Sequence, residues 1–119
     1  MNKYTELSDF KINRRIAVMI HKYSDFIEQY DNKTIYVDGN IFDPCNNPAD
    51  AMPIIIENNI DLLNGENMMP ELFGHHSAHT LHSFNAPISA DSLKEDKTIY
   101  RLGMEVFLMK KDAENSNGN

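Results

Sequence analysis

Four histidines lie within eight residues, and no other stretch of the sequence has side chains so well suited to binding a metal ion. They are His75, His76, His79 and His82. If this stretch were helical, His75 and His79 would share one face, and imidazole nitrogens are good zinc ligands. However, no glutamate stands next to the first histidine, as it does in the zinc proteases. The competing interpretation is a polar, solvated loop. We favour the loop, expect no cofactor, and keep a metal-dependent enzyme as the third candidate function.

A row of basic side chains on the first predicted helix is the second candidate site. Ser8 followed by Asp9 is typical of a helix start, and apolar spacing continues to about residue 21. The apolar side of this helix consists of Ile12, Ile16, Met19 and Ile20. The basic row on its outer side consists of Lys11, Arg14, Arg15 and Lys22. Such a row could contact nucleic-acid phosphates or an acidic protein, although it is more often a solvated helix face.

Other residues with reactive side chains give weaker signals. Asp50 and Glu57 are seven positions apart in a predicted helix, so they could act as acid and base or hold magnesium. More often such residues mark where a core helix meets water, and Asp50 could also cap a local turn. Cys45 has no histidine at a catalytic spacing and is expected to pack as a small apolar residue. We therefore expect no catalytic residues.

The composition fits one soluble domain. A chain of 119 residues can bury about two-thirds of its unfolded surface, so a core is feasible. The net charge of −7 argues against a generally basic nucleic-acid-binding protein, although residues 1–22 carry +3 and leave −10 for the rest. The sequence has one cysteine, no basic leader and no apolar run of about 18 residues, so we expect a cytoplasmic protein without a membrane contact. We assign residues 1–112 to the domain and residues 113–119 to a disordered tail.

The residues after the first helix predict a hairpin. Residues 26–30 and 34–37 are partly aromatic or β-branched, and the residues between them suit a turn. An Asp-Gly-Asn turn at residues 38–40 then ends the second strand. Residues 41–47 contain proline and asparagine, so we expect a shaped connection without strand structure.

The second predicted helix covers residues 48–58. Asn47 suits the cap and Pro48 suits the first helical position, because proline lacks an N–H that would be unpaired there in any case. Pro53 lies further inside, where its ring should bend the helix. The sequence is apolar around most of the helix axis, so we expect this to be the most buried element.

The middle of the chain has the weakest signals. Residues 60–63 predict a short strand. Residues 64–90 combine glycine, proline, asparagine and histidine without sustained periodicity, which predicts a long loop or a hairpin with irregular edges. Strands near residues 72–73 and 80–84 are the alternative.

The last predicted helix covers residues 97–111, with Asp96 as its cap. Gly103 in its middle costs about 1 kcal/mol relative to alanine, which we expect to be offset by the close approach of another backbone. Arg101 and Glu105 are four positions apart, so we expect them to pair on the outer face of the helix.

Three blocks of sequence resemble the small phage NinX-type proteins. The most specific block is residues 42–60, FDPCNNPADAMPIIIENNI, followed by residues 100–109, YRLGMEVFLM. The start of the chain, residues 4–15, also fits. The chain departs from the family in two ways. Met52 stands where relatives usually have tryptophan, and the histidine-rich segment looks like an insertion, which argues against a shared metal-dependent activity.

The resemblance implies a gene of a lambdoid tailed phage or prophage, expressed in the cytoplasm of the host bacterium. It also implies similarity to phage α/β/α sandwich domains, which suits our prediction of an α+β fold with a small, mainly antiparallel sheet and about three helices. It brings no activity with it. We therefore expect a phage accessory protein that binds a host or phage protein without catalysis. A nucleic-acid-associated factor using the first helix is the alternative, and the formation of a homo-oligomer stays open.

Overall fold

The computed structural model of the chain describes residues 3–21, 27–29, 33–63, 76–82, 86–92 and 97–117. Within these ranges there are three helices: α1 (Asp9–Ile20), α2 (Pro48–Glu57) and α3 (Ile99–Asn117). The strands in the same ranges are β1 (Ile27–Glu28), β2 (Ile35–Val37), β3 (Asn40–Phe42), β4 (Asp61–Leu63), β5 (Ser77–His82) and β6 (Ala86–Asp91).

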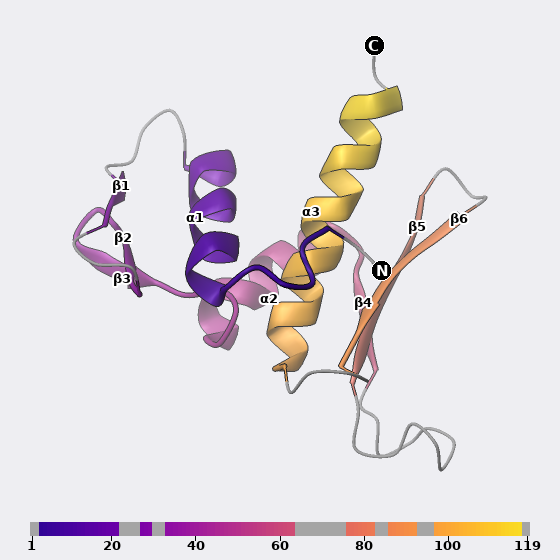
Figure 1. Ribbon diagram of the computed structural model, residues 1–119, viewed down its shortest axis with the longest axis horizontal. Coiled ribbons are helices and arrows are strands. Elements are labelled where there is room, and N and C mark those ends of the chain that lie inside the picture. The colour runs from indigo at the N-terminus through magenta and orange to yellow at the C-terminus, as the bar shows by residue number, and fades with distance from the viewer. Residues whose placement is uncertain are drawn as a thin grey trace.

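The strands form two antiparallel sheets, and the helices lie between them (Figure 1). The first sheet has the order β1-β2-β3 and the second has the order β4-β5-β6. α3 lies at the centre, with α1 and the first sheet on one side and the second sheet on the other. The predicted α+β class with three helices is confirmed. The arrangement differs from an α/β/α sandwich, in which one sheet lies between two layers of helices. Here α2 carries the chain past α3 and so separates the two groups of strands.

α1 begins where its capping residues predict. The Ser8 hydroxyl accepts a hydrogen bond from the backbone N–H of Lys11 (3.2 Å), which satisfies one of the unpaired donors at the helix start. Ile12 and Ile16 from the predicted apolar side are buried. Ile20 is not, because α1 extends beyond the elements that cover it.

The predicted hairpin is present, but a second hairpin follows it directly. β1 and β2 pair antiparallel within the predicted strands. Asp38 and Gly39 both have positive φ angles, 52° and 82°, as in the two-residue turns that join antiparallel strands. They therefore link β2 to β3, and Ile35 pairs with Phe42. The predicted connection without strand structure is wrong for residues 41 and 42.

The turn before α2 is fixed by contacts from both other helices. The Asn13 side chain on α1 donates to the Asp43 carboxylate (2.8 Å) and accepts from the backbone N–H of Cys45 (3.1 Å). The Thr98 hydroxyl, next to α3, donates to the carbonyl of Cys45. The Asn47 side chain accepts from the backbone N–H of Ala49 (3.0 Å), which confirms the predicted cap of α2.

α2 is less buried than the sequence predicts. Only Ala51, Ile54 and Ile55 are buried on this helix, and Ile56 is 68% exposed. On α3, by contrast, all residues from 101 to 108 are buried. The prediction that α2 is the most buried element is therefore wrong. α3 is the most buried helix because it lies at the centre, with helices on one side and a sheet on the other.

The second sheet occupies much of the predicted loop. β4 confirms the strand predicted at residues 60–63. β5 and β6 form a regular antiparallel pair, which agrees with the hairpin predicted for residues 64–90, whereas the long loop is wrong for both strands. The alternative strand at residues 80–84 overlaps the end of β5, and the one at residues 72–73 lies outside the described residues. Small side chains, Ala78 and Ala90, cover the buried face of this sheet, so its apolar alternation is weak in the sequence.

α3 is longer than predicted and starts from a different cap. The Thr98 hydroxyl accepts from the backbone N–H of Arg101 (3.0 Å), while the predicted cap Asp96 lies outside the described residues. The helix continues to Asn117, so residues 113–117 are helical where we expected a disordered tail. The division of the chain at residue 112 stays a prediction. Within the part of the chain that the structure describes, no helix is both long and apolar enough to span a bilayer.

Gly103 lets α2 approach α3 through a side chain. A Cβ atom at Gly103 would lie 3.0 Å from Cδ1 and 3.1 Å from Cγ1 of Ile55, closer than ordinary carbon contacts of about 3.5–4.0 Å. The predicted close approach at this glycine is present. Its partner is the side chain of Ile55 and not another backbone.

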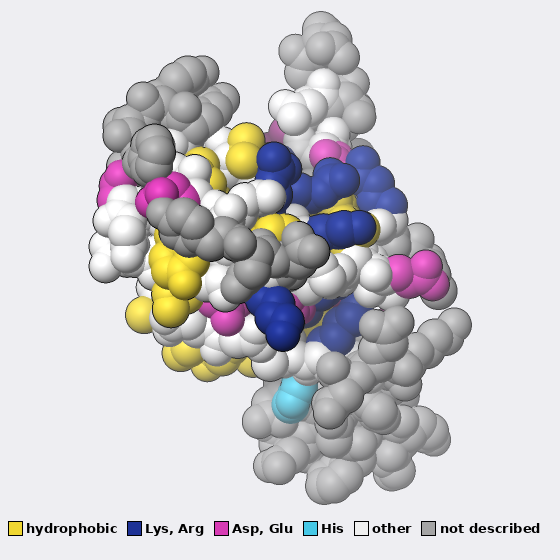
Figure 2. Space-filling view, turned by 60° about the vertical axis from the view of Figure 1, so that its left-hand side comes forward, with side chains coloured by type: hydrophobic (Ala, Val, Ile, Leu, Met, Phe, Trp, Pro, Cys, Tyr) yellow, Lys and Arg dark blue, Asp and Glu magenta, His cyan; other side chains and the backbone are white. Residues whose placement is uncertain are grey.

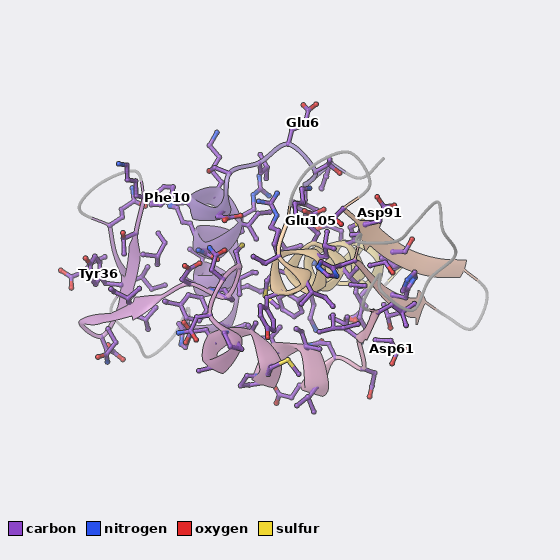
Figure 3. The ribbon with its side chains drawn as sticks, turned by 90° about the horizontal axis from the view of Figure 1, so that it is seen from below. Glu6, Phe10, Tyr36, Asp61, Asp91 and Glu105 are labelled. Atoms are coloured by element: carbon purple, nitrogen blue, oxygen red, sulfur yellow. The ribbon has the colours of Figure 1, made fainter. Side chains whose placement is uncertain are left out.

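Arg101 and Glu105 form the predicted pair, but the pair is inside the protein. Their closest atoms, Nε and Oε2, are 2.8 Å apart, and the two residues are only 4% and 1% exposed. Figure 3 shows Glu105 near the middle of the molecule, whereas Glu6 and Asp61 point outward. The predicted location on the outer face is wrong, because the N-terminal segment and α1 pack over this side of α3.

The remaining donors of Arg101 bind the N-terminal segment. Nη1 lies 2.7 Å from Oδ1 of Asp9, and Nη2 donates to the backbone carbonyls of Tyr4 (2.9 Å) and Leu7 (2.7 Å). Burial alone would lower the pKa of Arg101, but the hydrogen bond with Asp9 and the charge of Glu105 outweigh it and raise the pKa. The guanidinium therefore stays charged.

Lys97 adds a second cation to this pair. Its Nζ lies 2.7 Å from Oε2 of Glu105 and donates to the backbone carbonyl of Thr5 (2.9 Å). We call Arg101, Glu105, Lys97 and Asp9 the Arg101 cluster. It joins α3 to α1 and to the segment that precedes α1.

Replacing Gly103 by alanine should destabilise the protein despite the better helix propensity of alanine. Overpacking of a buried site costs about 1–3 kcal/mol, against a propensity gain of about 1 kcal/mol. Ile55→Val removes the nearest atom, so Gly103→Ala combined with Ile55→Val should be more stable than the sum of the two single changes predicts. Urea denaturation of the four proteins gives this coupling. Additive free energies would contradict the contact.

Replacing Arg101 by methionine should lower the free energy of unfolding by about 3–5 kcal/mol, because it leaves buried acceptors of the Arg101 cluster unpaired. Arg14→Met is the matched control, since Arg14 is exposed on α1, and it should change the free energy by less than about 0.5 kcal/mol. Equal effects in urea denaturation would show that the cluster does not stabilise the fold.

Candidate binding groove

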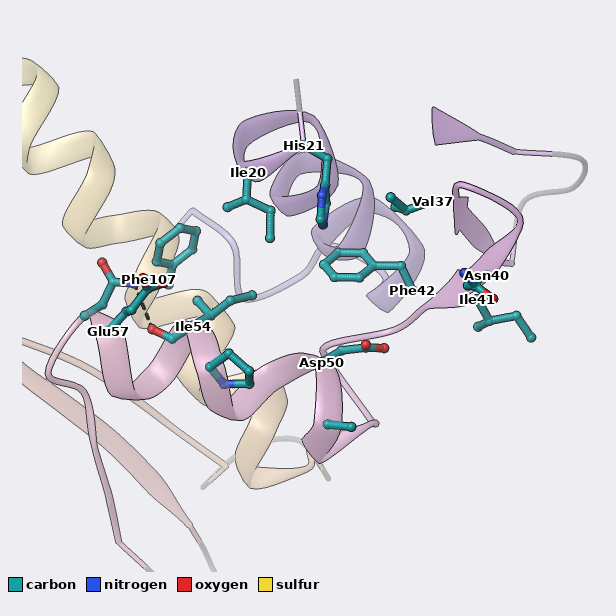
Figure 4. A pocket seen from close by; sticks show the side chains of 13 residues that line it. Ile20, His21, Val37, Asn40, Ile41, Phe42, Asp50, Ile54, Glu57 and Phe107 are labelled. Carbon is teal, nitrogen blue, oxygen red and sulfur yellow. Dashed lines mark hydrogen bonds between the residues drawn. The ribbon is translucent and has the colours of Figure 1, made fainter. Parts of the chain in front are cut away.

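An open groove runs between the end of α1, the β2–β3 hairpin and α2 (Figure 4). Its volume is about 380 Å³. The Phe42 ring lies in the groove, and the ring of His21 stands edge-on to it at 5.3 Å. These three parts of the chain, together with Phe107 of α3, therefore build one concave surface.

The groove has an apolar floor and exposed apolar edges. Phe42, Ile54 and Phe107 line it and are almost fully buried, so they form the floor. Ile20 on α1 is 42% exposed and Ile41 on β3 is 61% exposed, and both line the groove as well. Single exposed apolar residues are common on protein surfaces, but an apolar floor with exposed isoleucines beside it is typical of an interaction site.

A second hollow continues the groove toward the end of α3. It has a volume of about 610 Å³ and shares Ile20, Glu57 and Phe107 with the groove. Lys111 and Asn115 of α3 line its far side. The combined surface is long enough to follow α2 from its start to its end.

Asp50 and Glu57 both line the groove, but Asp50 has a structural task. Its Oδ2 accepts a hydrogen bond from the backbone N–H of Asp43 (2.9 Å) and lies 3.3 Å from the Asn47 amide. Asp50 therefore caps the turn before α2, in agreement with the local cap predicted as one of its possible roles. Glu57 is exposed at the last position of α2.

The basic row on α1 faces outward but partly binds the protein itself. Lys11, Arg14 and Arg15 are exposed, and Lys22 lies outside the described residues. Nε of Arg14 donates to the Gln29 side chain (2.9 Å). The Arg15 guanidinium lies 5.6 Å from the centre of the Tyr4 ring. Figure 2 shows several Lys and Arg side chains close together on one face, with acidic side chains beside them. A contact with nucleic acid through this row stays a prediction.

Two of the four candidate histidines, His79 and His82, lie in strand β5 and not in a helix. His79 lies in β5, where its Nε2 is 2.7 Å from the Ser77 hydroxyl. His76 directly precedes β5, and residues three positions apart in extended chain face opposite sides. The backbone of His82 is in β5, and His75 lies outside the described residues. In the described ranges, no group of three or more His, Cys, Asp or Glu side chains could hold a metal ion.

Cys45 is a buried thiol. Its side chain is fully buried, and burial together with the charge of Asp9 raises its pKa. A neutral, inaccessible thiol is a poor nucleophile, so its packing agrees with the apolar role predicted for it.

No single stretch of the sequence signals the groove directly. Ile20 belongs to an apolar helix side, which predicts a core position, and Ile41 follows a turn that is predicted to end a strand. One feature of the sequence does point to the groove: the apolar side of α1 continues to its last residue, Ile20. The hairpin turn at Asp38 and Gly39 would also have placed Ile41 on a strand.

The ionisation of Tyr4, whose ring lies next to Arg15, should lower the free energy of unfolding at high pH. Burial, followed by the hydrogen bond to Asp112 and its charge, raises the pKa of Tyr4 from 10.0 to about 12. Between these values the folded protein keeps a proton that the unfolded chain loses, so the free energy of unfolding falls as pH rises. Urea denaturation across this window should show a smaller slope for Tyr4→Phe. The buried thiol of Cys45 adds a slope of the same sign, which that variant leaves in place. An unchanged slope in Tyr4→Phe would contradict the assignment.

The comparison with protein families agrees with the three sequence blocks described above. A family model described as "Bacteriophage P22, NinX" matches residues 3–111, which include α1, α2, both sheets and most of α3. No curated protein and no solved structure matches the chain. The family match covers far more than half of the sequence, and the chain therefore belongs to the phage NinX family.

Proposed function

We propose that this phage protein is an accessory factor that binds another protein, of the phage or of the host, through the groove between α1, α2 and the β2–β3 hairpin. It catalyses no reaction and acts in the cytoplasm of the host bacterium. The observation that carries the proposal is the exposure of Ile20 and Ile41 beside the buried floor of the groove.

Burial of these two isoleucines by a partner would supply a driving force for binding. Full burial of an isoleucine side chain contributes about 1.5–3 kcal/mol. The floor adds aromatic surface from Phe42 and Phe107, and aromatic residues are enriched at the centres of protein interfaces. The β2–β3 hairpin and α2 are joined by the turn that Asn13 holds, so the groove is preorganised.

The reactive side chains support a role in binding more than one in catalysis. Cys45 is buried with a raised pKa, and Oδ2 of Asp50 accepts a hydrogen bond from the backbone N–H of Asp43 in the turn before α2. The groove thus offers shape and apolar surface, which are properties of a docking site.

The proposal can be tested by affinity purification from infected host cells. Ile41→Thr keeps a β-branched side chain on β3 and removes apolar surface. It should reduce recovery of the specific partner about tenfold. Ile56→Thr is the matched control, because Ile56 is 68% exposed on α2 and does not line the groove. It should leave recovery unchanged, and circular dichroism should show that both variants remain folded.

Two results would overturn the proposal. One is a partner that both variants retain equally. The other is the absence of a protein partner together with DNA binding at low salt that Arg14→Glu with Arg15→Glu abolishes. The second result would establish the alternative, a nucleic-acid-associated factor that uses the basic row on α1.

A further inference from the structure

The side of α2 that faces the groove offers negative charge and hydrogen-bond acceptors. Asp50 and Glu57 line the groove at the two ends of this helix. Between them, Ala49 and Pro53 line it as well, and Pro53 has no N–H to donate to the carbonyl of Ala49. The apolar floor is therefore bordered along α2 by the carboxylates of Asp50 and Glu57. The backbone carbonyl of Ala49 also borders it, and this carbonyl accepts no helical hydrogen bond from residue 53.

Glu57 is placed where its charge is unfavourable in the isolated protein. It is the last residue of α2, and the C-terminal end of a helix carries partial negative charge. The last turn of α2 has no basic residue. Lys110 from α3 approaches this end, but its Nζ donates to the carbonyl of Asn58 (3.0 Å). A cation brought by a partner would offset the repulsion between Glu57 and the helix end.

Among the described residues that line the groove, none is a lysine or an arginine. His21 stands on the opposite side, and Asn40 and Asn58 are neutral. Lys111 shares the adjoining hollow with Glu57, but its Nζ is paired with Glu114, at 3.3 Å. The acidic composition of the chain, with a net charge of −7, adds a long-range attraction for cations.

The spacing of the two acids suits a helical partner. Asp50 and Glu57 are seven positions apart on α2, which corresponds to about 10 Å along the helix axis. Residues seven positions apart on a second helix have the same separation and lie on nearly the same face. Apolar side chains between them would meet the floor formed by Phe42 and Ile54.

We infer that the groove binds a cationic amphipathic helix, whose apolar face covers Ile20 and Ile41 and whose lysine or arginine side chains lie against Glu57 and Asp50. This inference rests on the proposed function and specifies the chemistry of the partner. The affinity combines apolar burial with charge complementarity, and the charge also excludes acidic helices of the same apolar pattern.

Binding of synthetic helices to the full chain tests the inference. Two fluorescein-labelled peptides of about 14 residues, or roughly four helical turns, share the same leucine positions and carry either lysines or glutamates on the polar side. A third peptide keeps the lysines and has serine in place of leucine. Fluorescence anisotropy should show that the leucine–lysine peptide binds about tenfold or more tightly than either of the others.

Variants of the protein locate the binding site. Glu57→Gln should weaken binding of the leucine–lysine peptide about threefold to tenfold, and Ile41→Thr about tenfold. Glu6→Gln is the matched control, because Glu6 is an exposed acid that points away from the body of the protein, and it should have no effect (Figure 3).

The outcomes separate this inference from the proposed function. Equal binding of the lysine and glutamate peptides, weakened by Ile41→Thr and not by Glu57→Gln, would overturn the cationic partner and leave the groove as a binding site. Binding that Ile41→Thr does not weaken, or equal binding of the serine–lysine peptide, would overturn the groove as the site of this contact. Self-association in sedimentation that Ile41→Thr abolishes would identify the occupant as a second copy of the chain, which also overturns the inference.

Discussion

The buried guanidinium of Arg101 is the constraint on which the rest of the structure depends. Removing a charge from water is costly unless its hydrogen-bonding groups are satisfied, so each donor of this side chain must find an acceptor inside the protein. The acceptors come from Glu105 on α3, from Asp9 on α1 and from backbone carbonyls before α1. Meeting that requirement fixes the position of α1 on α3.

The position of α1 in turn determines the shape of the groove. Asn13 lies one turn after the start of α1 and holds the turn that begins at Asp43, so α1 and α2 are placed relative to each other by polar contacts. α1 then extends beyond its support, and Ile20 reaches the edge of the groove instead of the core. The buried charges of the Arg101 cluster place α1, and α1 is longer than the part of the core that it covers. The exposed end of α1 therefore becomes part of the interaction surface.

Local chemistry could be predicted from the sequence, and the arrangement of distant segments could not. Ser8 and Asn47 mark helix starts because capping depends only on nearby backbone N–H groups. The pairing of Arg101 with Glu105 follows from helix geometry, but the face on which they lie depends on what packs there. α2 is apolar around most of its axis, yet Ile56 is exposed, because its neighbours cover only one side. The groove combines four segments, α1, the β2–β3 hairpin, α2 and α3, and no single stretch of sequence encodes it.

The Arg101 cluster also determines when the protein can finish folding. Asp9 and Arg101 are 92 residues apart in the chain, and Tyr4 and Asp112 are 108 residues apart. During synthesis the N-terminal segment therefore emerges long before α3, its partner, has been made. Contacts of such high sequence separation form late and slow the folding of small domains. Until α3 is complete, Asp9 at the start of α1 lacks its charged partner, and the side of α1 that packs against α3 stays uncovered. The newly made chain is therefore exposed to aggregation until α3 has folded.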